Sequence, residues 1–380
     1  MRFDLSEDQQ EIQRAARELL AARATFARLR EVVAEADDEP TGMPDLSRTP
    51  GEDGALAAEL AALGWTGIAI PEEHGGQGLG LVELCAITEE LGHAVAAVPY
   101  LGTTTAALVV QHEGTEQQRG DWLPHLAAGE LRGATTFTGD RTPVPGATDA
   151  ALIVVGDPGG GPAALYAPGA GVAEDVRAID PSRGHGRVAI PELDPEEELG
   201  GRGEWLGGTP TPSGPGFDRA AIVVAAELVG VTQCALDMTV AYVRERKQFG
   251  RAVGSFQAVQ HGAAQMLRDV AVARVLTYNA AWVADAIDAT DDDAERTRLT
   301  GELPVAAAMA KAAASDAGRT VTAAAVQLHG GIGFTWEADV HWLLKRAQVD
   351  AALLGSAGQQ RRRIAARTVA PATERDGAAG

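Results

Sequence analysis

QLHGGIGF, at residues 327–334, is the stretch that decides how this chain folds, and RERKQFG, at residues 244–250, accompanies it. Both stretches interrupt Ala-rich segments whose apolar residues recur at helical spacing. The paired glycines of the first stretch allow a backbone to approach a rigid ligand closely. The arginines and glutamines of the two stretches offer forked donors, which a pyrophosphate or the edge of a flavin accepts. Together, the two stretches indicate a bound flavin.

Each stretch also has a purely structural interpretation. The cationic residues Arg244, Arg246, Lys247 and Arg251 can form a solvated helix end, although such a cluster can also reverse the potential inside one cleft of an acidic chain. The glycines after Gln327 can form a helix C-cap, with Gly in the left-handed conformation. A cap and a cofactor contact are compatible, so this interpretation does not exclude a flavin.

The length and charge of the chain narrow its function. A chain of 380 residues exceeds one typical domain and predicts two or three. The formal net charge of −21 argues against binding nucleic acid, because neutralising phosphates needs a basic face. No uninterrupted apolar stretch reaches the roughly 18 residues of a membrane span, and the N-terminus MRFDLSEDQQ lacks the pattern of a signal peptide. We therefore expect a cytoplasmic protein that binds neither nucleic acid nor a membrane.

Cysteine and histidine usage indicates no metal site. Cys85 and Cys234 both lie in apolar helical patterns, where a free cysteine behaves as a small buried hydrophobe. They form neither a disulfide framework nor a metal cluster. His329 and His341 have no partner at metal-ligand spacing, so we expect them to pack or to lie in loops. No metal is therefore predicted.

Helical periodicity defines an N-terminal domain, which we assign to residues 1–130. The segments predicted to be helical run from Ser6 to about Ala36, from Ala55 to Leu63 and from Leu81 to Val95. The glycines within 68–78 belong to a turn-rich loop. They do not form the dinucleotide-binding fingerprint, because their spacing is wrong and no strand-then-helix unit surrounds them.

The rest of the chain predicts two more domains and a tail. Residues 131–212 are assigned to a small β domain, since short β-branched runs alternate there with Gly/Pro clusters. Residues 213–370 are assigned to an antiparallel four-helix bundle. Its helices are expected at 217–246, 253–288, 302–329 and 338–367. Residues 371–380 are predicted to be a flexible tail.

Five motifs, in order along nearly the whole chain, carry a resemblance to a known family. They are IPEEHGGQG at 70–78, EELG at 89–92, YVRERKQFG at 242–250, SFQAVQH at 255–261 and QLHGGIGF at 327–334. In these motifs the chain resembles the acyl-CoA dehydrogenase family. The resemblance implies a mainly α fold with a small β domain: an N-terminal helical domain, a central β domain and a C-terminal four-helix bundle.

The resemblance also implies FAD as the cofactor and an oligomer. The residues that it assigns to the dinucleotide are Arg246, Gln248, Phe249, Gln327, Gly330 and Gly331. The first three are expected to contact the pyrophosphate and adenosine across a subunit interface, and the last three to line the same dinucleotide from the neighbouring chain. The cofactor then belongs to a dimer contact, and dimers are expected to pair. The resemblance suggests an electron-transfer flavoprotein as the electron acceptor.

The reaction that the resemblance implies needs a base. The family removes an α-proton from an acyl-CoA thioester and transfers a hydride from the β-carbon to the flavin. It uses a desolvated carboxylate, and such a base typically contributes roughly 10²- to 10⁴-fold. The family carries this Glu just before a Gly-Thr/Ser pair, where this chain has Leu354. Some members carry it on the first bundle helix instead, where alignment leaves Ala220. Neither expected carboxylate is present.

Other carboxylates near these positions have different expected roles. Asp350 lies four residues before the first base position, one helical turn back, and is the candidate substitute base, although a solvated helix-face carboxylate is the simpler interpretation. Glu227 lies about 10 Å along the helix axis from Ala220 and is expected to pack or to form an ion pair. Asp218 is expected to cap a helix that begins near Arg219.

The β domain departs from the family pattern. Members usually carry a loop containing TEPG that holds the flavin ring, whereas residues 136–140 here run almost directly into Val144. The segments 335–341 and 345–347 resemble bacterial members that work as heteromeric assemblies. In these assemblies one subunit type supplies the base, and a degenerate paralogue completes the FAD site and the interface. Degradation of fatty acids or steroid side chains is the process that this resemblance suggests.

These features leave two functional hypotheses open. The first is a FAD-dependent acyl-CoA dehydrogenase that desaturates an acyl-CoA thioester through an unusual base or within a competent complex. The second is a non-catalytic partner subunit that serves assembly and FAD contact. The assembly is then a homodimer, or a heterotetramer with a paralogous acyl-CoA dehydrogenase subunit. Recruitment to other flavin chemistry, such as oxygen-dependent tailoring, would require the full ring-binding loop.

Overall fold

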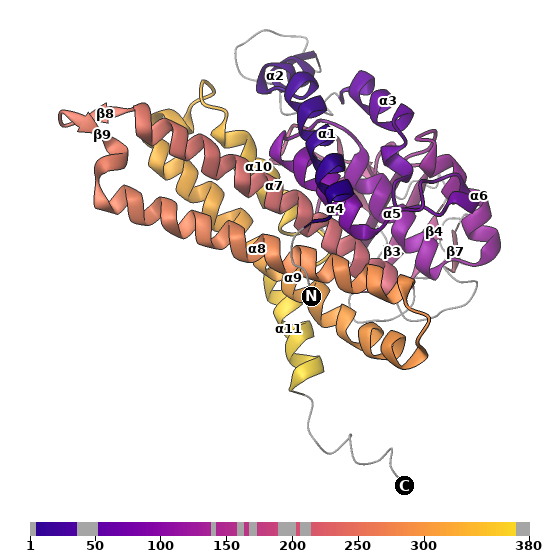
Figure 1. The fold of residues 1–380 in the computed structure, drawn as a ribbon. Helices are drawn as coiled ribbons and strands as arrows, with labels where there is room; N and C mark the ends of the chain where they lie inside the picture. The colour runs from indigo at the N-terminus through magenta and orange to yellow at the C-terminus, as the bar shows by residue number, and fades with distance from the viewer. Residues whose placement is uncertain are drawn as a thin grey trace.

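The computed structural model describes residues 5–35, 52–137, 142–157, 163–166, 173–188, 203–205 and 214–369. Its N-terminal part is helical, its middle part is built of short strands, and its C-terminal part is a bundle of long helices (Figure 1). This order confirms the predicted fold class. The tail at 371–380 and most of the Gly/Pro-rich segment before α3 lie outside the described residues.

The described residues of the N-terminal part form six α-helices. They are α1 (Glu7–Arg23), α2 (Phe26–Glu35), α3 (Gly54–Ala62), α4 (Leu81–His93), α5 (Tyr100–Glu113) and α6 (Glu116–Ala127). Ser6 caps α1 in a reciprocal capping box with Gln9, as its sequence suggests. The prediction of one helix from Ser6 to about Ala36 was wrong, because Ala24 leaves the helical conformation and the Thr25 hydroxyl accepts a hydrogen bond from the Arg28 N–H at 3.1 Å.

A carboxylate from the bundle caps α4. Asp285, on the helix α8 (Gln257–Ala289), accepts hydrogen bonds from the backbone N–H groups of Leu81 at 2.6 Å and Val82 at 3.0 Å. A Cβ on Gly80 would lie 2.6 Å from a carboxylate oxygen of Asp285, so any larger residue would have to displace this carboxylate from the N–H groups that it caps. Burial raises the pKa of Asp285 to about 6, even though both N–H groups favour the ionised form. This contact fixes the N-terminal helices to the bundle.

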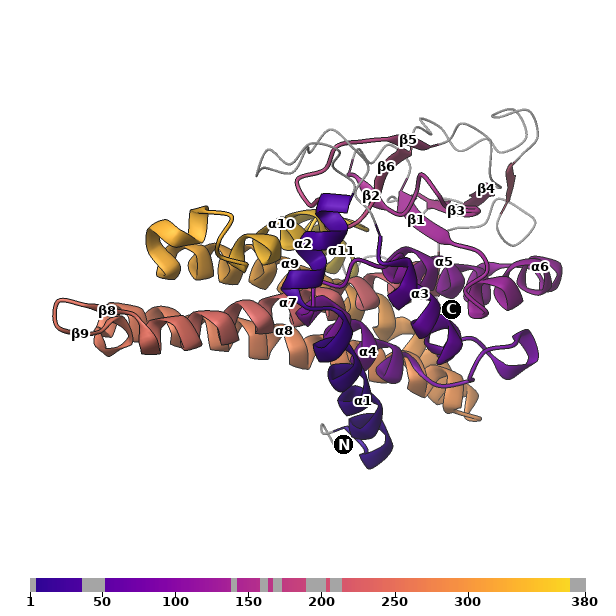
Figure 2. The ribbon, with the colours of Figure 1, turned by 90° about the horizontal axis from the view of Figure 1, so that it is seen from above.

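Two small sheets form the middle part. The first has the strand order β1 (Gly133–Phe137), β3 (Leu152–Gly156), β4 (Ala164–Tyr166) and β7 (Gly203–Trp205), with β1 and β3 parallel and the other pairs antiparallel. The second has the order β2 (Val144–Pro145), β6 (His185–Val188) and β5 (Ala173–Asp175). Figure 2 shows the strands as a layer beside α5, which packs against β1.

The bundle is built around one buried helix, α7 (Pro215–Glu245). A hairpin of β8 (Lys247–Gln248) and β9 (Arg251–Ala252) joins α7 to α8, and α9 (Asp293–His329), α10 (Val340–Asp350) and α11 (Ala357–Thr368) complete the bundle. By length and composition α7 could cross a membrane, but 83% of its most apolar window is buried inside the protein. We therefore assign it as the core helix.

The fourth predicted bundle helix, 338–367, is two helices separated by a turn, so that prediction was wrong. Leu354 and Gly355 have φ angles of +50° and +95°, which end the helical path. The Lys311 ammonium group donates to the carbonyls of Ala351 and Gly355, both at 3.3 Å. The Gln360 amide donates to the carbonyl of Leu354 at 2.7 Å. These buried side chains hold the turn in one conformation.

Candidate active site and cofactor surface

The predicted base position lies on a cavity of about 570 Å³. Leu354, only 4% exposed, is one of its lining residues. Phe137 and Phe217, whose rings stack at 5.5 Å, line another part of it. The acidic residue among those that line the cavity is Asp157, which is only partly buried. The position where the family carries its base is therefore apolar in this chain.

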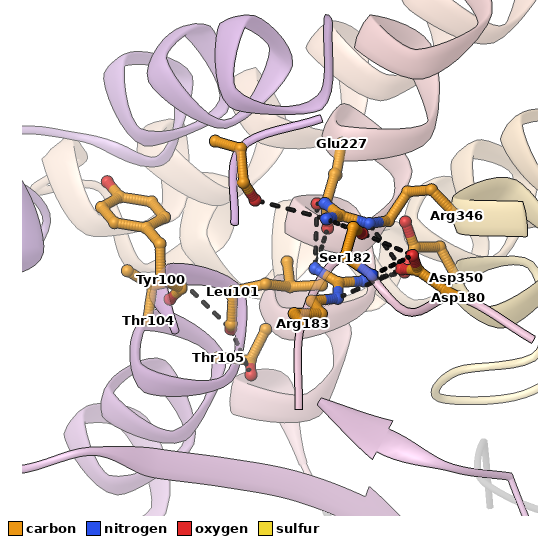
Figure 3. Close-up of polar contacts among 11 residues, drawn as sticks. Tyr100, Leu101, Thr104, Thr105, Asp180, Ser182, Arg183, Glu227, Arg346 and Asp350 are labelled. Atoms are coloured by element: carbon orange, nitrogen blue, oxygen red, sulfur yellow. Dashed lines mark hydrogen bonds and ion pairs between the residues drawn. The ribbon is translucent and has the colours of Figure 1, made fainter. Parts of the chain in front are cut away.

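A buried cluster of charged side chains lies near this turn but does not line the cavity. It joins Asp180 and Arg183, before β6, to Glu227 on α7 and to Arg346 and Asp350 on α10 (Figure 3). All five residues are at most 3% exposed. The two guanidinium groups lie between the three carboxylates in Figure 3. The cluster thus ties the middle part to two helices of the bundle.

Arg346 makes the most contacts in this cluster. Its guanidinium donates to Asp180 at 2.7 Å, to Glu227 at 2.7 Å, to the Ser182 hydroxyl at 2.6 Å and to the carbonyl of Ala96 at 3.3 Å. A planar guanidinium can serve several acceptors at once. Ala96 lies between α4 and α5, so one side chain connects all three parts of the fold.

Asp350 is bound to the second guanidinium of the cluster. Arg183 donates to Asp350 through one nitrogen, and to both oxygens of Glu227, at 2.9 and 3.2 Å, through another. Burial raises the pKa of Asp350 to about 8, and Arg183 only partly opposes this effect. The pKa of Asp180 is shifted in the opposite direction. Burial raises it, but the neighbouring arginines and the hydrogen bond from Ser182 outweigh burial, so the pKa is lowered. His185 stays uncharged at neutral pH, since burial lowers its pKa to about 4.

The structure tests the expected roles of two other carboxylates, Glu227 and Asp218. Glu227 forms ion pairs, with Arg183 and Arg346, as expected. The expectation that Asp218 caps a helix was wrong, because α7 begins at Pro215. The N–H group of Gly216, in the first turn of α7, donates at 2.9 Å to the carboxylate of Glu113 on α5. The buried Asp218 instead forms an ion pair, at 2.5 Å, with Arg363, which is partly exposed.

The residues predicted to contact FAD gather at one end of the bundle. Arg246, Gln248 and Phe249 lie where α7 passes into the β8–β9 hairpin, which Figure 1 shows at that end. The Gln327 segment closes α9 beside it, since the ring of Tyr242 on α7 stacks on His329 at 4.5 Å. Two stretches separated by about eighty residues of sequence are thus brought together.

The exposure and contacts of this end fit a dinucleotide bound between chains. The side chains of Arg246 and Gln327 are exposed, and within the described part of the chain neither has an ion pair or side-chain hydrogen bond. Phe249 is 91% exposed. Gly330 is the C-cap of α9, as the structural interpretation expected, but its φ of +67° and ψ of −146° lie outside the left-handed helical conformation that this interpretation gave it. No atom lies within 4 Å of where a Cβ of Gly330 or Gly331 would stand, so a ligand can approach the backbone.

The remaining predictions concern the shortened loop of the β domain, the histidines and the cysteines. The shortened loop falls partly on residues 138–141, which lie outside the described residues. His341 packs against the rings of Trp336 and Trp342, and both cysteines are buried and free.

A larger cavity, of about 810 Å³, lies between α1, α4, α7 and α8, away from Leu354. Its buried Glu89 and Glu90 are paired with arginines.

Comparisons with known proteins agree with this geometry. Residues 6–130 match the model of the acyl-CoA dehydrogenase N-terminal domain, and residues 211–369 match that of the C-terminal domain. The acyl-CoA dehydrogenase IpdE2 of Mycobacterium tuberculosis is 36% identical over 303 residues, which cover 80% of this chain and 82% of that protein. The chain therefore belongs to the acyl-CoA dehydrogenase family of oxidoreductases, whose members bind FAD.

Solved structures of paired subunits share the fold. A variant of the Tcur3481–Tcur3483 steroid ACAD is 29% identical, with a TM-score of 0.73, over 96% of this chain and 98% of that chain. The ChsE4–ChsE5 complex of Mycobacterium tuberculosis has a TM-score of 0.75 at 24% identity, over 98% of this chain and 100% of that chain. Homologues thus form heteromeric complexes.

Sequence reasoning did not find the residues that dominate the buried site. Asp180, Arg183 and Arg346 are far apart in sequence and were not singled out. The available signals were weak: an arginine that interrupts the apolar face of α10, and the run DPSR before β6. A third signal was the presence of several unexplained carboxylates, because buried arginines need paired acceptors.

Proposed function

We propose that this chain is one subunit of a heteromeric, FAD-dependent acyl-CoA dehydrogenase whose catalytic base comes from the paralogous partner. The complete enzyme desaturates an acyl-CoA thioester between its α and β carbons. Leu354 carries the proposal: a leucine lines the cavity where the reaction needs a group that accepts a proton. This chain then serves assembly and the FAD contact.

The substrate and setting follow from the relatives. IpdE2 is named an acyl-CoA dehydrogenase, and the solved Tcur3481–Tcur3483 pair is named a steroid ACAD, so we propose an acyl-CoA carrying a steroid or fatty acyl group as the substrate. We further propose a cytoplasmic heterotetramer that passes its electrons to an electron-transfer flavoprotein. The domain boundaries at 130, 212 and 370 remain predictions.

FAD, when bound, supplies the hydride acceptor. Arg246, Gln248 and Phe249 would hold it from one chain, and Gln327, Gly330 and Gly331 from the neighbour. The exposed guanidinium of Arg246 supports this assignment, because a charged donor without an internal partner can form charge-assisted hydrogen bonds to a pyrophosphate without first breaking an ion pair. The exposed Phe249 would be covered in the assembly.

The alternative is that this chain carries its own base, Asp350. The raised pKa of about 8 favours it, because a desolvated carboxylate is the stronger base. Two observations argue against Asp350 as the base: it is 0% exposed, and it forms an ion pair with Arg183. We therefore rank the partner's base first.

One pair of variants separates the two candidates. In the assembled enzyme, Asp350→Asn should keep the turnover rate if the partner supplies the base, and should lose it by roughly 10²-fold or more if Asp350 is the base. Glu227→Gln is the matched control, since it removes a charge from the same cluster without touching Asp350. A loss confined to Asp350→Asn would overturn the proposal, whereas equal small effects would support it.

A further inference from the structure

The larger cavity, of about 810 Å³, lies between α1, α4, α7 and α8. No described residue that lines it also lines the cavity beside Leu354. Its volume lies within the range of small-molecule sites, roughly 300–1,000 Å³. Part of its wall is apolar, since it includes Val82, Val275 and Trp282, of which the last two are 58% and 40% exposed. An apolar wall with a few polar groups beside it is the usual composition of a small-molecule site.

Two polar atoms on this cavity are buried and have no hydrogen-bond partner among the described residues: one oxygen of Glu89 and the hydroxyl of Tyr278. Arg274 donates twice to the other oxygen of Glu89, at 2.8 and 3.0 Å. Burial and the nearby Glu89 raise the pKa of Tyr278 well above its ordinary value, so its hydroxyl is uncharged. A buried polar atom without a partner costs free energy, which a ligand recovers when it supplies that partner.

The charges on the cavity favour a cation over an anion. The described lining residues contribute three carboxylates, those of Glu89, Glu90 and Asp237, and two guanidinium groups, those of Arg17 and Arg274. Arg17 is paired with Glu90, and Arg274 is paired with Glu89. A bound anion would therefore compete with these carboxylates for the guanidinium groups. A bound cation would compensate the carboxylate that has no arginine.

The remaining polar side chains also suit a cation. Among the described residues, Asp237 contacts the Gln233 amide, which donates to it at 2.8 Å, and His93, at 3.4 Å. The amide of Asn279 has no hydrogen-bond partner in the described part of the chain, so its carbonyl oxygen is available to accept. The ring of Trp282 lines the same cavity, and indole rings attract organic cations.

We propose that this cavity binds an organic cation in which a primary ammonium group is joined to a hydrocarbon body. The ammonium group donates to the free oxygen of Glu89 and to the Tyr278 hydroxyl, and the hydrocarbon packs against Val275 and Trp282. An ammonium group supplies the donors that both buried oxygens lack, whereas a carboxylate or phosphate head group supplies none and adds negative charge. An alcohol supplies one donor but leaves the charge uncompensated. This inference is independent of the proposed function.

Calorimetry on the full-length protein tests the choice of ligand. The probes are hexylamine, 1-hexanol and hexanoate, whose chains have the same length and whose head groups are positive, neutral and negative. We expect hexylamine to bind, and the other two to bind at least roughly ten-fold more weakly, because hydrogen bonds to a charged group are the stronger ones. Equal affinity for 1-hexanol would overturn the choice of a cation. Absence of hexylamine binding would overturn the site.

Variants of the cavity wall locate the bound amine. Replacement of Glu89 would also break its pair with Arg274, so Tyr278→Phe is the sharper variant. It removes a hydroxyl that has no partner, so its urea unfolding midpoint should not fall. Its dissociation constant for hexylamine should rise by roughly ten-fold. An unchanged dissociation constant in the folded variant would overturn the placement of the ammonium group.

A second pair of variants tests the apolar wall. Val275→Ala should raise the dissociation constant for hexylamine on the order of four-fold, which corresponds to one buried methylene group. Val272→Ala is the matched control, because Val272 is also a half-exposed valine of α8 but does not line the cavity. An equal effect in both variants would show that the amine binds the surface of α8 without a specific site, and would overturn the proposal.

Discussion

Replacing Arg346 with Met removes the side chain that connects the three parts of the fold. Met fills much of the same volume but donates no hydrogen bond. The carboxylates of Asp180 and Glu227, which are 0% and 3% exposed, each lose a contact at 2.7 Å. Glu227 retains Arg183, whereas among the described residues Asp180 keeps only Ser182 and a distant Arg183 nitrogen at 3.9 Å.

The expected cost follows from these contacts. Breaking a buried ion pair by removing one partner destabilises by about 3–5 kcal/mol, because the remaining charge is left buried without compensation. Arg346 serves two carboxylates, so we expect the upper part of this range. A second substitution, Asp180→Asn, should be less damaging in the Arg346→Met protein than in the wild type, with an interaction energy of about 0.5–3 kcal/mol.

Urea unfolding followed by circular dichroism measures both effects. Arg298→Met is the matched control, because Arg298 also pairs with two carboxylates, Glu295 and Glu302, but on the exposed surface of α9. We expect its unfolding midpoint to stay at the wild-type value. The reasoning fails if Arg346→Met unfolds at the same urea concentration as Arg298→Met, or if the two cluster substitutions simply add.

Three further predictions concern single contacts. Burial raises the pKa of Glu113 to about 7, so the stability it contributes is full below about pH 4.5 and declines by about 3 kcal/mol as pH rises through 7; Glu113→Gln should flatten urea midpoints measured across this window, and an unaltered slope would contradict this. Gly80→Ala should destabilise by about 1–3 kcal/mol in the same assay, because the new Cβ meets Asp285, whereas Gly54→Ala, which meets no atom within 4 Å, should not. Arg246→Ala should weaken flavin binding in the assembled protein by about 1.5–3 kcal/mol in a fluorescence titration, with Arg319→Ala as the control; equal retention of flavin would remove Arg246 from the cofactor site.

Periodicity and motif order were sufficient for the architecture. The capping box at Ser6 and the apolar periodicity of α4 and α7 are local features, so the sequence alone locates these helices. The breaks at Ala24 and at Leu354 were missed. The second break depends on Lys311 and Gln360, which approach the turn only in the folded bundle.

The candidate site could be predicted only in part, because its two halves depend on different interactions. Leu354 and the FAD motifs are read from contiguous residues. The bond between Arg183 and Asp350 joins residues 167 positions apart, and no periodic pattern records such a pairing. The simpler interpretation of Asp350, a solvated carboxylate on a helix face, was wrong, because Asp350 is completely buried.

The central claim is that the base comes from a partner, and one measurement tests it directly. The chain is purified alone and together with its paralogue, each is supplied with FAD, and the flavin absorption is recorded without oxygen as an acyl-CoA is added. We predict that the absorption bleaches only when the paralogue is present. Bleaching by the chain alone, with formation of the enoyl-CoA, would contradict the account and would make Asp350 and Asp157 the next residues to replace.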